Sequence, residues 1–129
     1  MKKILVIVLL IFAFGCKEDV TSPNKNELVG KWKKDFVSGI KVKYDKIIIE
    51  FTNDNKVIHT AANSEVKSES LIGSYNYDNG IVILIDTDCK EVPGKYELEF
   101  RNNGVEFKLI DDECLRKEVI TGFFEKYIE

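Results

Sequence analysis

The chain has 129 residues, 44% hydrophobic and 32% charged, which is enough for one folded domain and too apolar for a disordered chain. Its net charge of −3 and pI near 5.3 argue against a nucleic-acid partner, because there is no excess of cations to neutralise phosphates. One histidine and three cysteines leave few ligands for a transition-metal site, so we expect no metal and no cofactor.

The N-terminus has the pattern of a secretory signal. Lys2 and Lys3 precede an unbroken apolar run over residues 4–14. As a helix this run would reach about 16 Å, roughly half of a ~30 Å hydrocarbon core, so it is too short to span a membrane. Two small residues, Ala13 and Gly15, then lead to Cys16. This order is typical of a cleavage site.

A cysteine at such a site resembles the lipobox of bacterial lipoproteins. The resemblance implies that residues 1–15 are removed and that Cys16 is acylated on its sulfur and on the new N-terminus. The alternative is an ordinary secretory signal with an incidental cysteine. Residues 17–19 (Lys-Glu-Asp) resemble the surface-export signal of Bacteroidetes lipoproteins, although any solvated tether is polar. We therefore expect a lipidated tether over residues 16–26, attachment to the outer membrane, and exposure at the cell surface.

From residue 27 onward the sequence predicts short β-strands joined by tight turns. Apolar residues alternate with polar ones in several segments, and Asn79–Gly80 and Asn103–Gly104 are strong hairpin signals because these residue types tolerate positive φ. One helical turn is expected at residues 111–117. The eight expected strands are residues 28–37, 44–51, 56–62, 69–78, 81–86, 95–101, 105–110 and 118–128.

Eight antiparallel strands can form a two-sheet sandwich or a closed barrel. Sequential hairpins without long crossovers favour the barrel, and closure also removes exposed strand edges. The predicted fold is therefore all-β, an eight-stranded antiparallel up-and-down barrel over residues 27–129.

Two groups of residues resemble bacterial lipocalin-like domains. Residues 28–32 (Leu-Val-Gly-Lys-Trp) match the L-x-G-x-W opening of these domains. The second half carries Cys89, residues 93–96 (Pro-Gly-Lys-Tyr) and residues 112–114 (Asp-Glu-Cys) in the order found in the bacterial pattern. The last strand departs from the family, because residues 122–124 (Gly-Phe-Phe) stand where a tryptophan is common.

The resemblance implies roles for residues at the ends of the barrel. Trp32 is expected to be a structural plug at a closed end, stacked under a basic side chain. Arg116 is the candidate for that cation, and Arg101 is the other arginine of the chain. Asp112 is expected to cap the short turn that follows it and to pair with Arg116.

Cys89 and Cys114 remain once Cys16 is used for lipidation. In an exported chain, two remaining cysteines predict a disulfide. The alternative is a reactive dithiol or a metal site, but no histidine or second cysteine pair accompanies them. The acidic residues that flank both cysteines would then converge at one end of the barrel, as solvated turns or as a Ca²⁺ site.

Catalysis is not expected, because the single histidine, His59, has no adjacent nucleophile or carboxylate pair and no catalytic motif occurs. We expect His59 to be a wall or surface residue of the third strand. The first functional hypothesis is a barrel that binds a small hydrophobic molecule. The pocket residues expected from the inward-facing positions are Ile47, Ile49, Leu71, Tyr75, Ile83, Leu98 and Phe107.

The second hypothesis is a protein-binding or inhibitory module of the cell envelope, because small lipid-anchored bacterial barrels include inhibitors of lysozyme. Removal of residues 1–15 takes away two basic residues and no acidic one, which leaves a charge of −5 that would steer the domain toward a basic partner. A cavity above ~300 Å³ would support the ligand hypothesis, and a filled interior would support the second.

Overall fold

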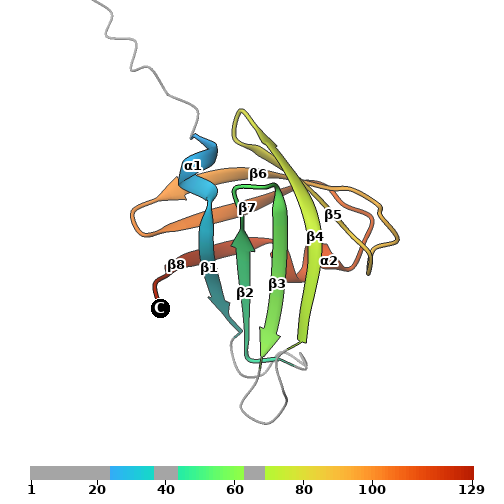
Figure 1. Cartoon of the computed structure of the whole chain (residues 1–129), viewed down its shortest axis with the longest axis horizontal. Coiled ribbons are helices and arrows are strands. Elements are labelled where there is room, and N and C mark those ends of the chain that lie inside the picture. The colour runs from blue at the N-terminus through green and yellow to red at the C-terminus, as the bar shows by residue number, and fades with distance from the viewer. Residues whose placement is uncertain (1–23, 37–43, 63–68) are drawn as a thin grey trace, which may run out of the picture.

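The computed structural model describes residues 24–36, 44–62 and 69–129. Eight antiparallel strands pair in chain order and close into a barrel, which confirms the predicted fold. In Figure 1, β1 to β4 form the near wall and β6 to β8 cross behind them. The elements are α1 (Lys25–Leu28), β1 (Gly30–Asp35), β2 (Lys46–Phe51), β3 (Lys56–Ala62), β4 (Glu69–Asp78), β5 (Ile81–Asp86), β6 (Gly94–Arg101), β7 (Gly104–Asp111), α2 (Arg116–Ile120) and β8 (Gly122–Tyr127).

The pairing of β1 with β8 closes the barrel. Trp32 lies opposite Lys126 in this antiparallel pair. This ladder excludes the two-sheet sandwich. Every described strand pair lies between residues 30 and 127, so the predicted signal peptide and Cys16, which lie outside the described residues, are not needed for closure.

The barrel has two different ends. In an up-and-down barrel, alternate connections lie at the same end. One end therefore carries α1 and the turns after β2, β4 and β6, and we call it the α1 end. The other end carries the connections after β5 and β7, including α2, and we call it the α2 end. Within the described residues, no helix combines the length and the apolar character needed to cross a membrane.

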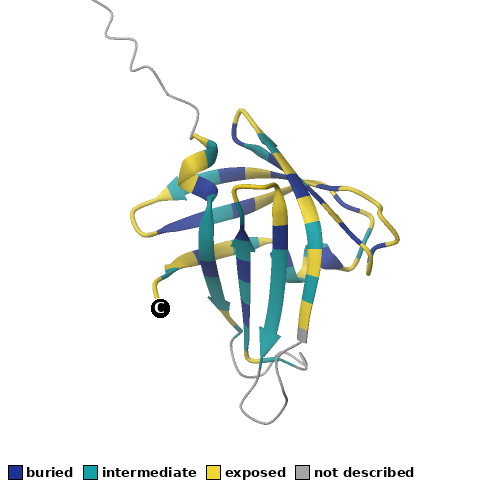
Figure 2. Cartoon of the chain, viewed as in Figure 1, coloured by how far each residue is buried: buried dark blue, intermediate teal, exposed yellow. Residues whose placement is uncertain are grey.

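The interior between the two ends is packed with large side chains. Buried and exposed residues alternate along the strands, as Figure 2 shows. Phe107 lies near the centre, with its ring centroid 5.2 Å from that of Phe124 and 6.2 Å from that of Phe51. Tyr75 packs edge-on against Phe51 at 4.9 Å. Of the two phenylalanines that open β8, Phe124 therefore belongs to the core, whereas Phe123 is 40% exposed.

The α1 end is closed by Leu28 and Trp32. The Trp32 indole Nε1 donates a hydrogen bond to the Leu28 carbonyl oxygen at 2.8 Å, and both side chains are buried. The ammonium of Lys126 lies 5.4 Å from the Trp32 ring centroid. The basic side chain over Trp32 is thus Lys126 and not Arg116 or Arg101, because closure places β8 directly beside β1.

Two helical segments differ from the sequence prediction. Residues 118–120, expected to begin the last strand, belong to α2, because this helix buries Ile120 completely in the barrel. The carbonyls at its C-terminal end accept hydrogen bonds from Lys34 Nζ, at 3.2 Å from Val119 and 2.6 Å from Thr121. At the other end of the barrel, α1 begins at Lys25, inside the span expected to be tether.

Of the two hairpin turns predicted from Asn-Gly pairs, one is confirmed and one is displaced. Asn79 and Gly80 both have positive φ, as a tight hairpin turn requires. The second turn consists of Asn102 and Asn103, and Gly104 is already the first residue of β7. Glycine is needed at this position because a Cβ atom would lie 2.5 Å from the Phe124 carbonyl oxygen.

Candidate functional site: a pocket at the α2 end

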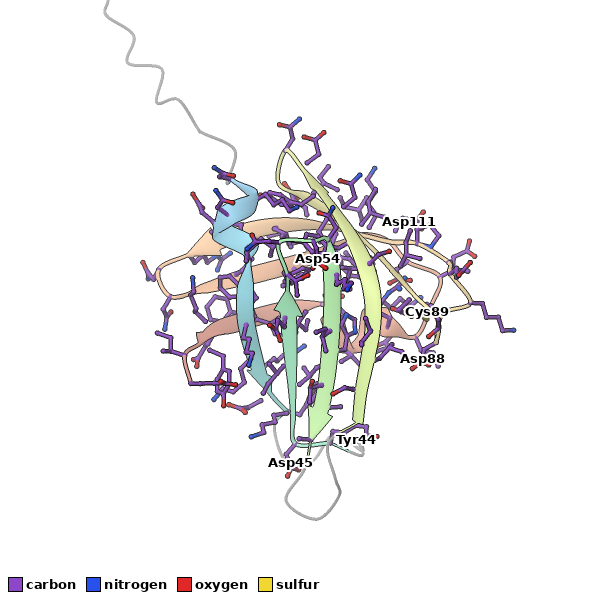
Figure 3. The ribbon with its side chains drawn as sticks, in the orientation of Figure 1. Tyr44, Asp45, Asp54, Asp88, Cys89 and Asp111 are labelled. Atoms are coloured by element: carbon purple, nitrogen blue, oxygen red, sulfur yellow. A yellow bond between two sulfur atoms is a disulfide. The ribbon has the colours of Figure 1, made fainter. Side chains whose placement is uncertain are left out.

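An open pocket with a volume of about 560 Å³ lies at the α2 end. Its walls come from the end of β5, from β3 and β4, and from the connection that contains α2. In Figure 3, Tyr44 lies at the bottom of the barrel, and Asp88 and Cys89 lie on its right side. The lining residues are Tyr44, His59, Ala61, Ser70, Leu71, Asp86, Asp88, Cys89, Cys114, Leu115, Arg116, Val119 and Ile120.

A disulfide joins the two connections that form one side of this pocket. Cys89 follows β5 and Cys114 precedes α2, and their Cα atoms are 5.7 Å apart. The predicted pairing is confirmed. The bridge holds the β5–β6 connection against α2, so it fixes the shape of the pocket wall.

A buried ion-pair cluster lies next to the disulfide. Arg116 Nη1 donates to Asp86 Oδ2 at 2.7 Å, and its Nε donates to Asp112 Oδ2 at 2.8 Å. Nη2 donates to the Val92 carbonyl oxygen at 2.9 Å, so each guanidinium nitrogen is engaged. Burial disfavours the charge, but the hydrogen bonds from Arg116 to Asp112 and Asp86 hold the pKa of Arg116 above its usual range. Arg116 therefore holds α2 and the end of β5, which both line the pocket, in a fixed position relative to each other.

Asp112 joins three structural elements. Its Oδ1 accepts a hydrogen bond from the Cys114 backbone N–H at 2.9 Å, which is the turn cap expected from the sequence. Its Oδ2 accepts from Arg116 and from the Tyr96 hydroxyl. Burial and the neighbouring Asp112 carboxylate raise the pKa of Tyr96, so this hydroxyl keeps its proton and donates it.

Gly94 allows β6 to approach this cluster. A Cβ atom at this position would lie 2.6 Å from Arg116 Nη2 and would also collide with the Asp112 carboxylate. Gly94 of the sequence motif therefore permits a close approach between β6 and the ion pair.

His59 lines the pocket and carries a buried polar atom without a hydrogen-bond partner in the described part of the chain. It lies on β3, and its Nε2 is buried with no hydrogen-bond partner among the residues that the structure describes. Burial lowers the pKa of His59 to about 4, and Arg116 adds to this effect while Asp86 and Asp88 oppose it. The imidazole is thus neutral at pH 7, and one of its hydrogen-bonding sites is unused.

The comparisons with known proteins support the fold alone. No protein-family model and no curated protein matches the sequence. The structure is similar to the crystal structure of an uncharacterized protein from Bacteroides eggerthii, with a TM-score of 0.52 and 14% sequence identity. The similarity covers 78% of this chain and 99% of that chain. The comparison therefore supports the barrel and carries no activity to this chain.

The structure places most of the predicted pocket residues in the core. Leu71 lines the pocket. Ile83 does not face inward, because it is partly exposed while its neighbours Val82 and Leu84 are fully buried. The predicted residues that fill the core are Ile47, Ile49, Tyr75, Leu98 and Phe107.

The sequence prediction missed the contribution of α2 to the pocket. Leu115, Val119 and Ile120 supply much of its apolar lining. Leu115 and Val119 are four residues apart, which is the spacing of one helical face, so this pair could have extended the expected helical turn beyond residue 117. Across residues 24–36, 44–62 and 69–129, no three His, Cys, Asp or Glu side chains gather closely enough to hold a metal ion.

Proposed function

We propose that this chain is a lipid-anchored protein of the cell envelope whose barrel binds a small, largely apolar molecule at the α2 end. The observation that carries this proposal is the open pocket of about 560 Å³ above a packed core. This volume lies within the range of roughly 300–1,000 Å³ that is usual for small-molecule sites. The anchor is proposed from the lipobox-like position of Cys16.

Burial of apolar surface would supply most of the binding free energy. Leu71 and Val119 offer aliphatic contacts, and each CH₂ group of a ligand buried there would contribute about 0.8 kcal/mol. The disulfide and the Arg116 cluster already hold the wall in place, so little ordering of the protein would oppose binding. The site binds its ligand without transforming it.

The open pocket at the α2 end favours this function over the inhibitory one. The inhibitor hypothesis expects a barrel with a filled interior and an interface elsewhere on the surface. The described part of the chain has a filled centre, but it also has a pocket larger than the ~300 Å³ that separates the two hypotheses.

A pair of consecutive residues on β4 tests the pocket directly. Leu71 lines the pocket, whereas Ile72 is 61% exposed on the outer face of the barrel. In residues 24–129, Leu71→Asp should abolish the fluorescence increase of the uncharged probe 1-aminoanthracene, because it places a carboxylate against the ligand. Ile72→Asp carries the same charge and should bind the probe as the wild type does. Equal binding by both variants would place the probe elsewhere.

The anchor needs a separate test in cells. The full chain should fractionate with the outer membrane and be digested by protease added to intact cells, whereas Cys16→Ser should be released from the membrane. A Cys16→Ser chain that stays tightly attached would refute lipidation, and a protected wild-type domain would place it on the periplasmic side.

A further inference from the structure

We infer that the occupant of the α2-end pocket is an uncharged amphiphile, and that its hydroxyl group forms a hydrogen bond with Nε2 of His59. This inference rests on the proposed function and specifies the chemical class of the ligand. It is carried by the unpartnered imidazole nitrogen, the charges of the lining and the complete engagement of Arg116.

The buried nitrogen calls for a polar partner. An imidazole nitrogen removed from water without a hydrogen bond is unfavourable, because its desolvation is not compensated. Most buried polar side-chain atoms in folded proteins have a partner. His59 Nε2 has none among the described residues, and the side chain lines the pocket. The atom itself is closed off from solvent, so the imidazole ring must turn toward the pocket for a ligand to reach it and supply the missing partner.

A hydroxyl group suits this atom in either tautomer. A neutral imidazole carries its proton on one nitrogen, so Nε2 is either a donor or an acceptor. Burial keeps His59 neutral at pH 7. A hydroxyl both donates and accepts, so it can bond with both forms. A carboxylate only accepts, and an ammonium group only donates.

The charges of the lining exclude an anion. Asp86 and Asp88 carry negative charge in the lining, and Arg116 is its one cation among the described residues. Arg116 is already bonded to Asp86, to Asp112 and to the Val92 carbonyl. Among the described lining residues, a ligand carboxylate would therefore meet two carboxylates and no unengaged cation.

The hydrogen bonds that Asp86 accepts also leave no buried carboxylate oxygen of this residue free for a cationic ligand. Asp86 Oδ2 accepts from Arg116, and its Oδ1 accepts from the Cys89 backbone N–H at 3.0 Å. The other carboxylate of the lining, Asp88, is exposed, so a pair with it would be screened by solvent. An ammonium group would therefore lose its hydration without gaining an unoccupied buried carboxylate. The apolar residues Leu71, Val119 and Ile120 surround the remaining space and suit a hydrocarbon body. An uncharged head on an apolar chain fits both parts of the pocket.

A matched set of three ligands tests the head group. The full chain in lipid nanodiscs, with its single histidine labelled with ¹⁵N, reports on His59 without ambiguity. Leu71 and Ile120, labelled with ¹³C in their methyl groups, report on the apolar lining. The chain is titrated at pH 7 with 1-octanol, octanoate and octylamine, and free ligand concentrations are measured in the aqueous phase. We expect 1-octanol to bind at least tenfold more tightly than the other two and to shift the His59 resonances.

Substitution of His59 separates the contribution of its hydrogen bond to ligand affinity from the contribution of apolar burial. In His59→Leu, the Leu71 and Ile120 methyl signals should show 1-octanol binding weakened about fivefold. Ile58→Ala, on the adjacent position of β3, should leave the affinity unchanged. Unchanged affinity in His59→Leu would overturn the role of His59.

The outcomes distinguish this inference from the proposed function. Octanoate or octylamine binding as tightly as 1-octanol, with shifts of the same methyl signals, would overturn the inference and leave a ligand-binding barrel. Absence of saturable shifts with all three ligands would overturn both.

Discussion

Replacement of His59 by leucine should change how stability depends on pH. The pKa of His59 is lowered by burial to about 4 in the folded protein, against 6.5 for an ordinary histidine. Between these values the unfolded chain binds a proton that the folded chain does not. The wild type therefore loses stability as the pH falls from 6.5 toward 4, and His59→Leu lacks this loss.

The size of the effect follows from the two pKa values. The loss approaches about 1.4 kcal/mol per pH unit and amounts to about 2 kcal/mol at pH 5 relative to pH 8. At pH 7 the variant should be at least as stable as the wild type, because it removes a buried nitrogen without a partner. A histidine kept only for structure would instead destabilise the barrel when replaced.

Urea unfolding of residues 24–129 at pH 8, 7, 6 and 5 measures this difference. Because the chain has a single histidine, His59→Leu removes the whole imidazole titration, and the difference between the two proteins reports on it. The gap in unfolding free energy should widen in favour of the variant as the pH falls. Parallel curves for the two proteins would show that the folded barrel protonates His59 freely, and the account of a neutral buried imidazole would be wrong.

Three further substitutions test the wall of the pocket. Replacing both Cys89 and Cys114 by alanine should lower the unfolding free energy by about 3 kcal/mol, because the bridge closes a loop of 25 residues; an unchanged denaturation midpoint would contradict this. Arg116→Met should cost about 3–5 kcal/mol at pH 7 in urea unfolding, since it leaves Asp86 buried without its cation; equal stability of the two proteins would argue against the ion pair. Gly94→Ala should cost about 1–3 kcal/mol through the collision with Arg116, and a wild-type melting temperature would refute that close approach.

Strand positions were predictable where the alternation of apolar and polar residues and the turn-forming residues indicated the same strand ends. The bounds of β3, β4 and β5 are those expected from the sequence, and Asn79–Gly80 sets the register between the last two. The disulfide was also predictable on the expectation that the chain is exported and that Cys16 is lipidated, because one pairing of the other two cysteines is then available.

The face of β5 was not predictable from its own residues. Ile81–Asp86 is apolar on both faces, so alternation cannot tell which set points inward. The register with β4 and β6 decides it, and places Val82 and Leu84 inside instead of Ile83.

Other features could not be predicted, because they depend on contacts between residues that are far apart in the sequence. The Lys126 ammonium reaches Trp32 because β8 returns to β1. The Nε2 atom of His59 lacks a hydrogen-bond partner within the described residues because of the residues that surround the ring in space. The position of His59 in the sequence of β3 does not reveal these neighbours. Helix α1 did have a local signal, since Asn24 precedes Glu27 by three residues in the pattern of a helix start.

Intermolecular NOEs between bound 1-octanol and the methyl groups of the barrel test the central claim most directly. Contacts from the ligand to Leu71, Val119 and Ile120 are predicted, because these residues line the pocket at the α2 end. Contacts confined to the outer face of the barrel at Ile72, or to the α1 end at Leu28, would contradict the account.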